Sequence, residues 1–309
     1  MHTQAAFGVD RRRQIIDFMS DFTLETTPGS AAKVPDFRAH ARAGATLYIT
    51  FLEGSDFDAT VAVARRLRSE GFNPVPHLTA RSIADERALE GILARLTGEI
   101  GVHQVLCIAG AGKTPAGAFS DTLQLLGTGL FDKYGISHIG VAGHPEGSPD
   151  IPDEAVSQAL DWKNQFASRT AARIYLVTQF CFEAGPIIAW EKRLRAEGNR
   201  LPIRIGIPGL ATIRTLLGHA KACGIGPSMH FLTRQAMNVA RLMSVAAPDR
   251  LVADLAAFKA GDPGCLIEGV HLYPLGGLKK SADWAHAVVD GHFKMNRDGR
   301  GFEVEMPHA

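Results

Sequence analysis

The sequence predicts a single-domain (β/α)8 TIM barrel. Eight apolar segments with strand-type patterning alternate with helical segments along most of the chain. This alternation extends over roughly 250 residues, which is the usual size of such a barrel. Several of the strand segments also end in a polar residue. A parallel barrel builds its active site from the carboxyl ends of its strands, so this pattern favours the same fold.

The expected strands are short runs rich in β-branched and aromatic residues. They lie at residues 22–27, 46–52, 74–80, 104–110, 137–143, 173–182, 202–209 and 269–275. Apolar residues at helical spacing predict the connecting helices, which lie at residues 57–70, 83–98, 152–168, 186–197, 210–222, 232–246, 249–259 and 281–292. An amphipathic helix beginning at Arg11 precedes the first strand, and a short polar tail from Lys294 to Ala309 follows the last helix. We therefore expect residues 1–309 to form one domain.

Two glycine-containing segments argue against nucleotide-binding folds. A doubly wound sheet normally carries a G-x-G-x-x-G turn after its first strand, but the segment from Glu25 to Gly29 contains one glycine only. The stretch from Gly110 to Gly117 resembles a phosphate loop, yet Cys107 stands where that motif needs its first glycine. We interpret this stretch as a loop after the fourth strand, where Gly110 lets the backbone approach a ligand closely.

Composition excludes several classes of function. The formal net charge is +1, so no broad attraction to nucleic acid or to a membrane surface is expected. The chain has no uninterrupted apolar run of about 18 residues and no apolar signal region at its start. We therefore expect a cytoplasmic protein without a nucleic-acid or membrane partner. The four cysteines form no Cys-x-x-Cys pair, which argues against a zinc site and leaves no metal ligands to propose.

Polar residues at the strand ends are the candidate site. Glu25 ends the first expected strand, Thr50 the second and His77 the third. Partial burial favours the protonated form of a carboxyl, so Glu25 is a candidate general acid, with a solvated or salt-bridged glutamate as the alternative. Gln179 carries the donor and acceptor needed to bind the amide edge of a heterocycle. The alternative for both His77 and Gln179 is a hydrogen-bonded core residue.

Four motifs follow one another on the expected strands: Leu24-Glu25-Thr-Thr-Pro28, Pro76-His77-Leu78-Thr79, Thr178-Gln179-Phe180-Cys-Phe182 and Ile207-Pro208-Gly209. The last expected strand, with its run from His271 to Leu275, and the His-Pro-Glu at residues 144–146 belong to the same pattern. In this order the motifs resemble the methylenetetrahydrofolate reductase family, from about Phe22 to Tyr273.

The resemblance implies a barrel that reduces 5,10-methylenetetrahydrofolate to 5-methyltetrahydrofolate, or that runs this reaction backwards. In that family NAD(P)H reduces FAD, and the folate then stacks on the flavin and takes a hydride. By this resemblance Glu25 is the acid that protonates the tetrahydrofolate substrate. The implied folate-binding residues are Gln179, Phe182, Tyr273 and Leu275. The implied cofactor-binding residues are Thr50, His77, Gly110, His144 and Lys163.

The chain departs from the family pattern on the flavin side. Ala109-Gly110-Ala111 stands where the family has Arg-Gly-Asp. Other family residues, a Tyr, a Tyr, a His and an Arg, are replaced by Ala118, His144, Ser148 and Gly277. We therefore expect FAD to bind weakly or not at all, with NAD(P)H passing its hydride directly to the folate.

Two other functions remain open at this point. The first is a folate-binding barrel that has lost catalysis, which the missing Asp favours and the retained Glu25 opposes. The second is a barrel enzyme that acts on an unrelated heterocycle. The sequence leaves open the choice between NADH and NADPH and the direction of the reaction. It also leaves open whether the protein is a homo-oligomer and whether it serves methionine synthesis or methyl-group catabolism.

Overall fold

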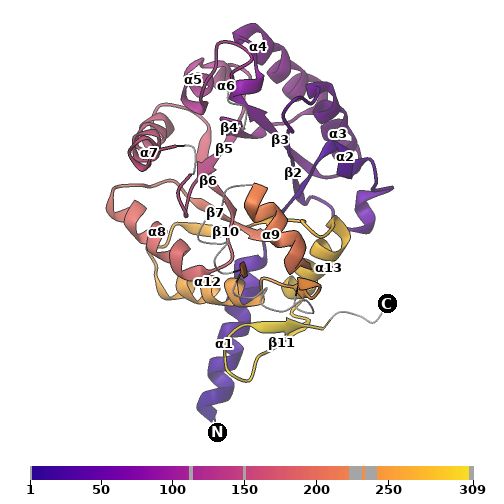
Figure 1. The fold of residues 1–309 in the computed structure, drawn as a ribbon, viewed down its shortest axis with the longest axis vertical. Helices are drawn as coiled ribbons and strands as arrows, with labels where there is room; N and C mark the ends of the chain where they lie inside the picture. The colour runs from indigo at the N-terminus through magenta and orange to yellow at the C-terminus, as the bar shows by residue number, and fades with distance from the viewer. Residues whose placement is uncertain (1, 111–113, 149–150, 223–231, 234–241, 306–309) are drawn as a thin grey trace. The chain divides into compact units, whose positions relative to one another are not determined.

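The structure, a computed structural model, describes residues 2–110, 114–148, 151–222, 232–233 and 242–305, with side chains described from residue 11 onward. Its central feature is a closed barrel of eight parallel strands in the order β1-β10-β7-β6-β5-β4-β3-β2 (Figure 1). This confirms the predicted fold class. The barrel strands are β1 (Thr23–Thr26), β2 (Thr46–Ile49), β3 (Asn73–Thr79), β4 (Gln104–Ile108), β5 (His138–Gly143), β6 (Arg173–Phe180), β7 (Ile203–Pro208) and β10 (Ile267–Tyr273).

Helices connect these strands, and most of them lie where the apolar periodicity predicts; the short helices at residues 28–31, 122–127 and 130–133 were not predicted. The connecting helices are α2 (Pro28–Ala31), α3 (Phe57–Ser69), α4 (Glu86–Ala94), α5 (Thr122–Gly127), α6 (Leu130–Lys133), α7 (Asp153–Ala167), α8 (Ala184–Ala196), α9 (Ile213–Ala222), α12 (Asp249–Gly261) and α13 (Leu278–Val289). The side chain of the residue before the helix caps the N-terminus of several of them. Asp56, Asp85 and Asp121, for example, each accept a backbone N–H of the first helical turn.

Two predicted helices differ from the structure at their ends. The predicted helix at 210–222 begins only at Ile213, because Ala211–Thr212 forms a short strand, β8. Residues 245–246, predicted as the end of a helix, form β9 (Val245–Ala246), which pairs antiparallel with β8. A two-residue bridge of this kind depends on a partner distant in sequence, which periodicity within one segment does not report. Residues 234–241 of that predicted helix lie outside the described residues.

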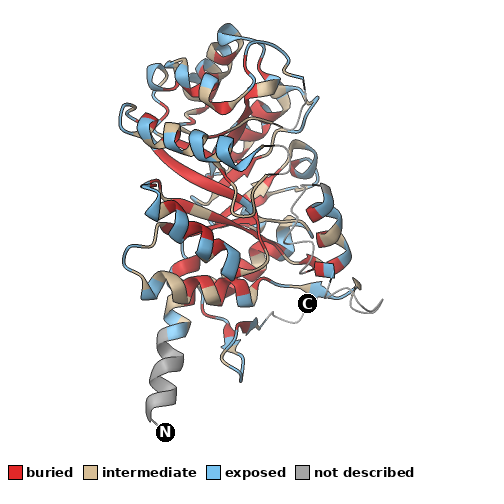
Figure 2. Cartoon of the chain, turned by 60° about the vertical axis from the view of Figure 1, so that its left-hand side comes forward, coloured by how far each residue is buried: buried red, intermediate tan, exposed pale blue. Residues whose placement is uncertain are grey.

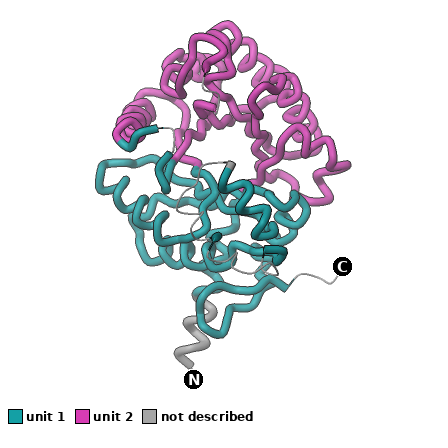
Figure 3. Tube along the Cα trace, in the orientation of Figure 1, with its two compact units in different colours: residues 1–22, 144–153, 178–309 teal, residues 23–143, 154–177 magenta. Residues whose placement is uncertain are grey.

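The chain forms two compact units, each built from several sequence segments (Figure 3). Unit 1 consists of residues 1–22, 144–153 and 178–309, and unit 2 of residues 23–143 and 154–177. Strands β1 to β5 belong to unit 2 and β7 and β10 to unit 1, while β6 contributes to both. The extent of the predicted domain, residues 1–309, stays a prediction.

Most strand residues of unit 2 are buried on both faces of the sheet, as expected for a parallel sheet that is covered by helices. Figure 2 shows buried residues concentrated in the strands and exposed residues on the outer faces of the helices. Side chains from β2, β3, β4 and β6 meet in one interior cluster that contains Tyr48, Val75, Leu106, Tyr175 and Val177. Alternate residues of a strand point to the same face. Thr50 and His77 therefore lie on the same face as the cluster residues Tyr48 and Val75, two residues further along the chain.

In unit 1 the N-terminal helix α1 (His2–Met19) packs against α12 and α13. The C-terminal stretch differs from the polar, peripheral tail that we expected. It includes the strands β11 (Phe293–Met295) and β12 (Phe302–Val304), which pair antiparallel. Phe302 is buried and stacks on Trp284, and the buried Phe293 ring packs against Phe302, so two aromatic side chains dock the hairpin on the core. Among the described residues, no helix combines the length and apolar character needed to cross a membrane.

Candidate functional site

Three of the predicted site residues meet within unit 2. Glu25 lies in β1, Thr50 directly follows β2 and His77 lies in β3. The Thr50 hydroxyl donates a hydrogen bond to Glu25 Oε1, and His77 Nε2 lies 3.8 Å from Glu25 Oε2. The side chains of Glu25 and His77 are 12% and 6% exposed. This burial does not fit a solvated glutamate, whereas the contact with His77 keeps the salt-bridged alternative open.

The two oxygens of the Glu25 carboxyl have different neighbours. Oε1 accepts the Thr50 hydroxyl, and Oε2 lies on the side of His77. Burial in a low-dielectric interior disfavours a charged carboxylate, whereas an imidazolium beside it would favour the charge. The 3.8 Å between His77 Nε2 and Glu25 Oε2 places the two titratable groups next to each other.

The loop after β4 is held to the loop after β3. Gly110 has a φ angle of +92°, and a Cβ at this position would lie 3.3 Å from the Thr79 side chain. The Arg81 guanidinium donates to the Ser120 carbonyl oxygen at 2.9 Å and to that of Gly110 at 3.4 Å. Glycine at 110 thus allows the turn and the close approach. Ala111, where the family pattern has Asp, lies outside the described residues.

Lys163, predicted as a cofactor contact, is a buried residue of α7. Its Nζ donates to the Ala142 carbonyl oxygen at 3.1 Å, and burial lowers the pKa of the amine to about 8. An ammonium carries three N–H donors. One backbone carbonyl uses one of them, so the Lys163 amine can also bind an anionic group such as a phosphate.

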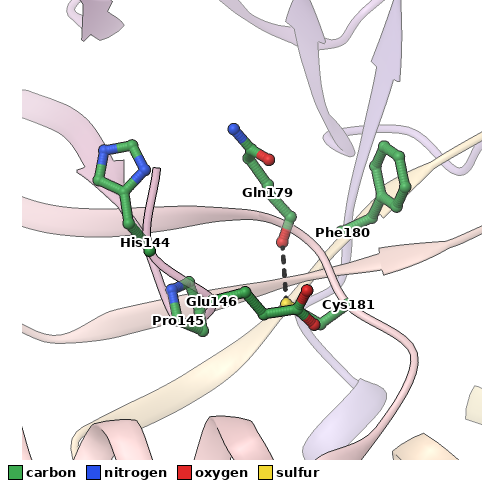
Figure 4. Close-up of a pocket in the computed structure, with 7 residues that line it drawn as sticks. His144, Pro145, Glu146, Gln179, Phe180 and Cys181 are labelled. Carbon is green, nitrogen blue, oxygen red and sulfur yellow. Dashed lines mark hydrogen bonds between the residues drawn. The ribbon is translucent and has the colours of Figure 1, made fainter. Parts of the chain in front are cut away.

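Unit 1 contains a separate group of the predicted site residues. His144, Pro145, Glu146 and Gly147 line a pocket together with Gln179, Phe180 and Cys181 (Figure 4). Gln179 lies at the carboxyl end of β6 and is exposed, although most of that strand is buried. In Figure 4 the Gln179 amide points away from the Glu146 carboxylate, which turns toward Cys181. The exposure of Gln179 argues against the alternative of a satisfied core amide.

The predicted folate residues Phe182, Tyr273 and Leu275 pack around one apolar cluster of unit 1. Phe180 lies between two of them. Its ring meets Phe182 and Tyr273 edge to face, with centroid distances of 5.8 Å and 5.6 Å. The Tyr273 hydroxyl donates to the Thr178 carbonyl oxygen at 2.9 Å, which fixes the ring. A set of rigid aromatic faces of this kind suits a flat aromatic ligand.

Two residues of the site were not singled out from the sequence. Phe180 fills the centre of the aromatic cluster, and Glu146 lines the pocket with Gln179. Phe180 belongs to the Thr-Gln-Phe motif, and Glu146 belongs to the His-Pro-Glu motif, so the motifs contained both signals. Alternation along β6 would have oriented Phe180 away from Gln179 and toward the core.

The described residues fit a flavin only in part. The single proton of the Thr50 hydroxyl is donated to Glu25, so Thr50 can accept from a flavin but cannot also donate to it. His77 Nε2 faces the same carboxylate. Lys163 alone of these three presents donors to an anion. Nor does the described part of the chain contain a cluster of three His, Cys, Asp or Glu residues that could hold a metal ion.

Comparison with known proteins gives consistent results. A profile of the family described as methylenetetrahydrofolate reductase matches residues 38–274. Methylenetetrahydrofolate reductase 2 of Saccharomyces cerevisiae is 32% identical over 124 residues, which cover 40% of this chain and 19% of that protein. Methylenetetrahydrofolate reductase 1 of Schizosaccharomyces pombe is 27% identical over 165 residues, which cover 50% of this chain and 26% of that protein. The chain therefore spans only about a quarter or less of these curated relatives.

A solved structure resembles the chain over most of its length. It is an uncharacterized protein from Clostridium thermocellum that binds two copies of 5-methyl-5,6,7,8-tetrahydrofolic acid. The TM-score is 0.53 at 12% sequence identity, and the match covers 87% of this chain and 93% of that protein. At this identity the likeness supports the barrel fold alone.

Proposed function

The chain belongs to the methylenetetrahydrofolate reductase family, and from this premise we propose that it interconverts 5,10-methylenetetrahydrofolate and 5-methyltetrahydrofolate with NAD(P)H. The observation that carries the proposal is the Glu25 carboxyl, which is largely buried, accepts the Thr50 hydroxyl and faces His77. A carboxyl in such surroundings can hold a proton and deliver it to a bound substrate. We also propose that the protein works in the cytoplasm.

Reduction of the methylene bridge requires one proton and one hydride. The proton passes from Glu25 Oε2 to N10 of the folate, and the bond between N10 and the bridging carbon breaks. The carbon stays on N5 as an iminium. NAD(P)H supplies the hydride that converts this iminium to a methyl group. Oε1 accepts the Thr50 hydroxyl, and we propose that the proton is presented from Oε2, on the side of His77.

Gln179 and the aromatic cluster are the proposed folate-binding groups. The exposed Gln179 amide offers a donor and an acceptor to the amide edge of the pterin. Phe182, Tyr273 and Leu275 offer apolar area to the benzoyl part, with Tyr273 held by its bond to Thr178. This division assigns the polar end of the substrate to the end of β6 and the aromatic part to the cluster.

FAD is not part of the proposed reaction. Thr50 and His77 both turn toward Glu25, and Ala109 lacks the charge of the family's Arg. Lys163 and His144 are the residues that would still hold a flavin, if it binds. The measurement is the amount of flavin released from the purified protein by denaturation. One flavin per chain that survives gel filtration would return the protein to the flavin-dependent reaction of its family.

The direct test is turnover of the purified protein without added flavin. We expect oxidation of NADH or NADPH that depends on 5,10-methylenetetrahydrofolate, with 5-methyltetrahydrofolate as the product by mass spectrometry. The reverse assay starts from 5-methyltetrahydrofolate and the oxidised nucleotide. Absence of turnover in both directions, with and without added FAD, would refute the proposed reaction.

The second candidate is a folate-binding protein without catalysis. Ala111 stands where the family has Asp, which favours this candidate, whereas the retained Glu25 opposes it. Gln179 and the aromatic cluster, which are the proposed folate-binding groups, remain in either case. Calorimetric titration with 5-methyltetrahydrofolate separates the candidates. Binding without turnover supports the second candidate, and binding with turnover supports the first.

A further inference from the structure

Two tyrosines and a glutamine form a hydrogen-bonded chain inside unit 2, which we call the tyrosine ladder. The Tyr48 and Tyr175 hydroxyl oxygens lie 2.7 Å apart, and Gln104 Nε2 donates to the Tyr175 hydroxyl at 2.9 Å. Tyr48 is fully buried and Tyr175 is 6% exposed. The ladder therefore joins β2, β4 and β6 through polar groups in the barrel interior.

The surroundings of the ladder are apolar. Val75, Leu106 and Val177 belong to the same buried cluster as the two tyrosines. A buried phenol hydroxyl needs a hydrogen-bond partner, and hydrogen bonds strengthen in a low-dielectric interior, so the ladder restricts both rings to one arrangement. The barrel also makes room for it. A Cβ at Gly140 would lie 3.0 Å from the Tyr175 hydroxyl oxygen, closer than real Cβ atoms pack without the neighbour giving way.

The Tyr48 end of the ladder lies next to the candidate acid site. The Tyr48 ring meets the His77 ring edge to face, with centroids 6.1 Å apart and planes at 80°. His77 in turn faces Glu25 at 3.8 Å. We propose that Tyr48 is a positioning residue, anchored by Tyr175 and Gln104, that holds the His77 imidazole in the orientation in which it controls the Glu25 proton. This inference rests on the proposed function in one respect only, the use of Glu25 as the acid.

The groups around the imidazole come from three strands. The Glu25 carboxyl faces it from β1 and the Tyr48 phenol from β2, while its partner in β4 is the apolar Leu106. Removing the Tyr48 hydroxyl detaches the ring from Tyr175, so the ring that packs against the His77 imidazole is less restrained. A shift of this ring changes the orientation of the imidazole, and through it the position of the proton on Glu25.

The first test does not depend on activity. Side-chain ¹⁵N resonances of His77, assigned with a His77→Gln variant, report its tautomer and its titration. We expect Tyr48→Phe and Tyr175→Phe to change the tautomer signature of His77 and the pH at which it titrates. Tyr134→Phe is the matched control, because its hydroxyl bonds Glu90 on the surface of the same unit. Unchanged His77 resonances in folded Tyr48→Phe and Tyr175→Phe proteins would overturn the inference.

The second test is a double-mutant cycle with the acid. Tyr48→Phe should lower kcat by about 10-fold, the scale of a misoriented catalytic group, with the KM for the folate unchanged. In a Glu25→Gln background the same change should add less than about twofold, because the proton that it orients is gone. Equal losses in both backgrounds would mark Tyr48 as purely structural. If the wild-type protein shows no turnover, the proposed function fails, and the ¹⁵N measurement still decides this inference.

Discussion

Asp249, the first residue of α12, carries a partly buried carboxyl that its surroundings keep protonated at unusually high pH. Burial raises the pKa of this carboxyl from 3.8 to about 6, and the nearby Glu303 adds to the effect. Trp284 Nε1 donates to Asp249 Oδ1 at 2.9 Å, and this hydrogen bond lowers the pKa and offsets part of the increase. The informative change is Asp249→Asn, which keeps an oxygen for Trp284 and removes the ionisable proton.

The direction in which stability changes with pH follows from the number of protons that the folded and unfolded states bind. The unfolded chain loses this proton near the ordinary pKa of 3.8, whereas the folded protein keeps it until about pH 6. Between these values the unfolded state binds fewer protons, so the free energy of unfolding falls as the pH rises. The difference between 3.8 and about 6 corresponds to about 3 kcal/mol. The Asn variant does not ionise, so above about pH 7 it should be more stable than the wild type by about 2–3 kcal/mol.

The assay is urea unfolding followed by circular dichroism at about pH 3.5, about pH 5 and about pH 7.5. The advantage of Asp249→Asn should be small at the lowest pH, about half of its full value at the middle one and full at the highest one. Asp254→Asn is the matched control on the same helix, since its carboxyl is 43% exposed and pairs with Arg250 at 3.7 Å. The control should change stability by less than about 0.5 kcal/mol. An Asp249→Asn advantage that is absent, or that does not vary with pH, would refute the assignment of the buried carboxyl.

Further predictions concern the site and the barrel interior. Glu25→Gln removes the proton but keeps the shape, so turnover should fall by roughly 10²-fold or more while folate still binds, and unchanged kcat in the steady-state assay would exclude Glu25 as the acid. Gln179→Ala removes both amide contacts, so folate affinity by calorimetry should fall by about 1–3 kcal/mol, or roughly 5- to 150-fold, and equal affinities would exclude Gln179 from the folate site. Gly140→Ala introduces a Cβ at 3.0 Å from the Tyr175 hydroxyl oxygen, so it should destabilise the fold by about 1–3 kcal/mol in urea. A Gly140→Ala protein that is more stable than the wild type would show that the interior can accept the added methyl group, and would contradict this packing argument. Gly218→Ala, where the helix leaves open space around the new Cβ, is its control.

The alternation of the sequence was sufficient to predict the barrel. Strand and helix patterns are local, and each expected barrel strand overlaps its observed counterpart, as 74–80 overlaps Asn73–Thr79. Right-handed crossovers between successive parallel strands then leave few arrangements for eight such units. Placing Glu25 and His77 near strand ends was equally local, because a polar residue that ends an apolar run is visible in the sequence alone.

The tertiary structure decided what each of these residues contacts. Tyr48 and Tyr175 are 127 residues apart in sequence, yet their hydroxyl oxygens share a hydrogen bond. Nothing local to either strand indicates that Gly140 leaves the space for this bond. Val245 and Phe302 show the same limit, since one joins a strand and the other is buried only because a distant segment supplies the partner. Local pattern determines which elements form. The partner of each side chain depends on the closure of the barrel, which is a property of the whole chain.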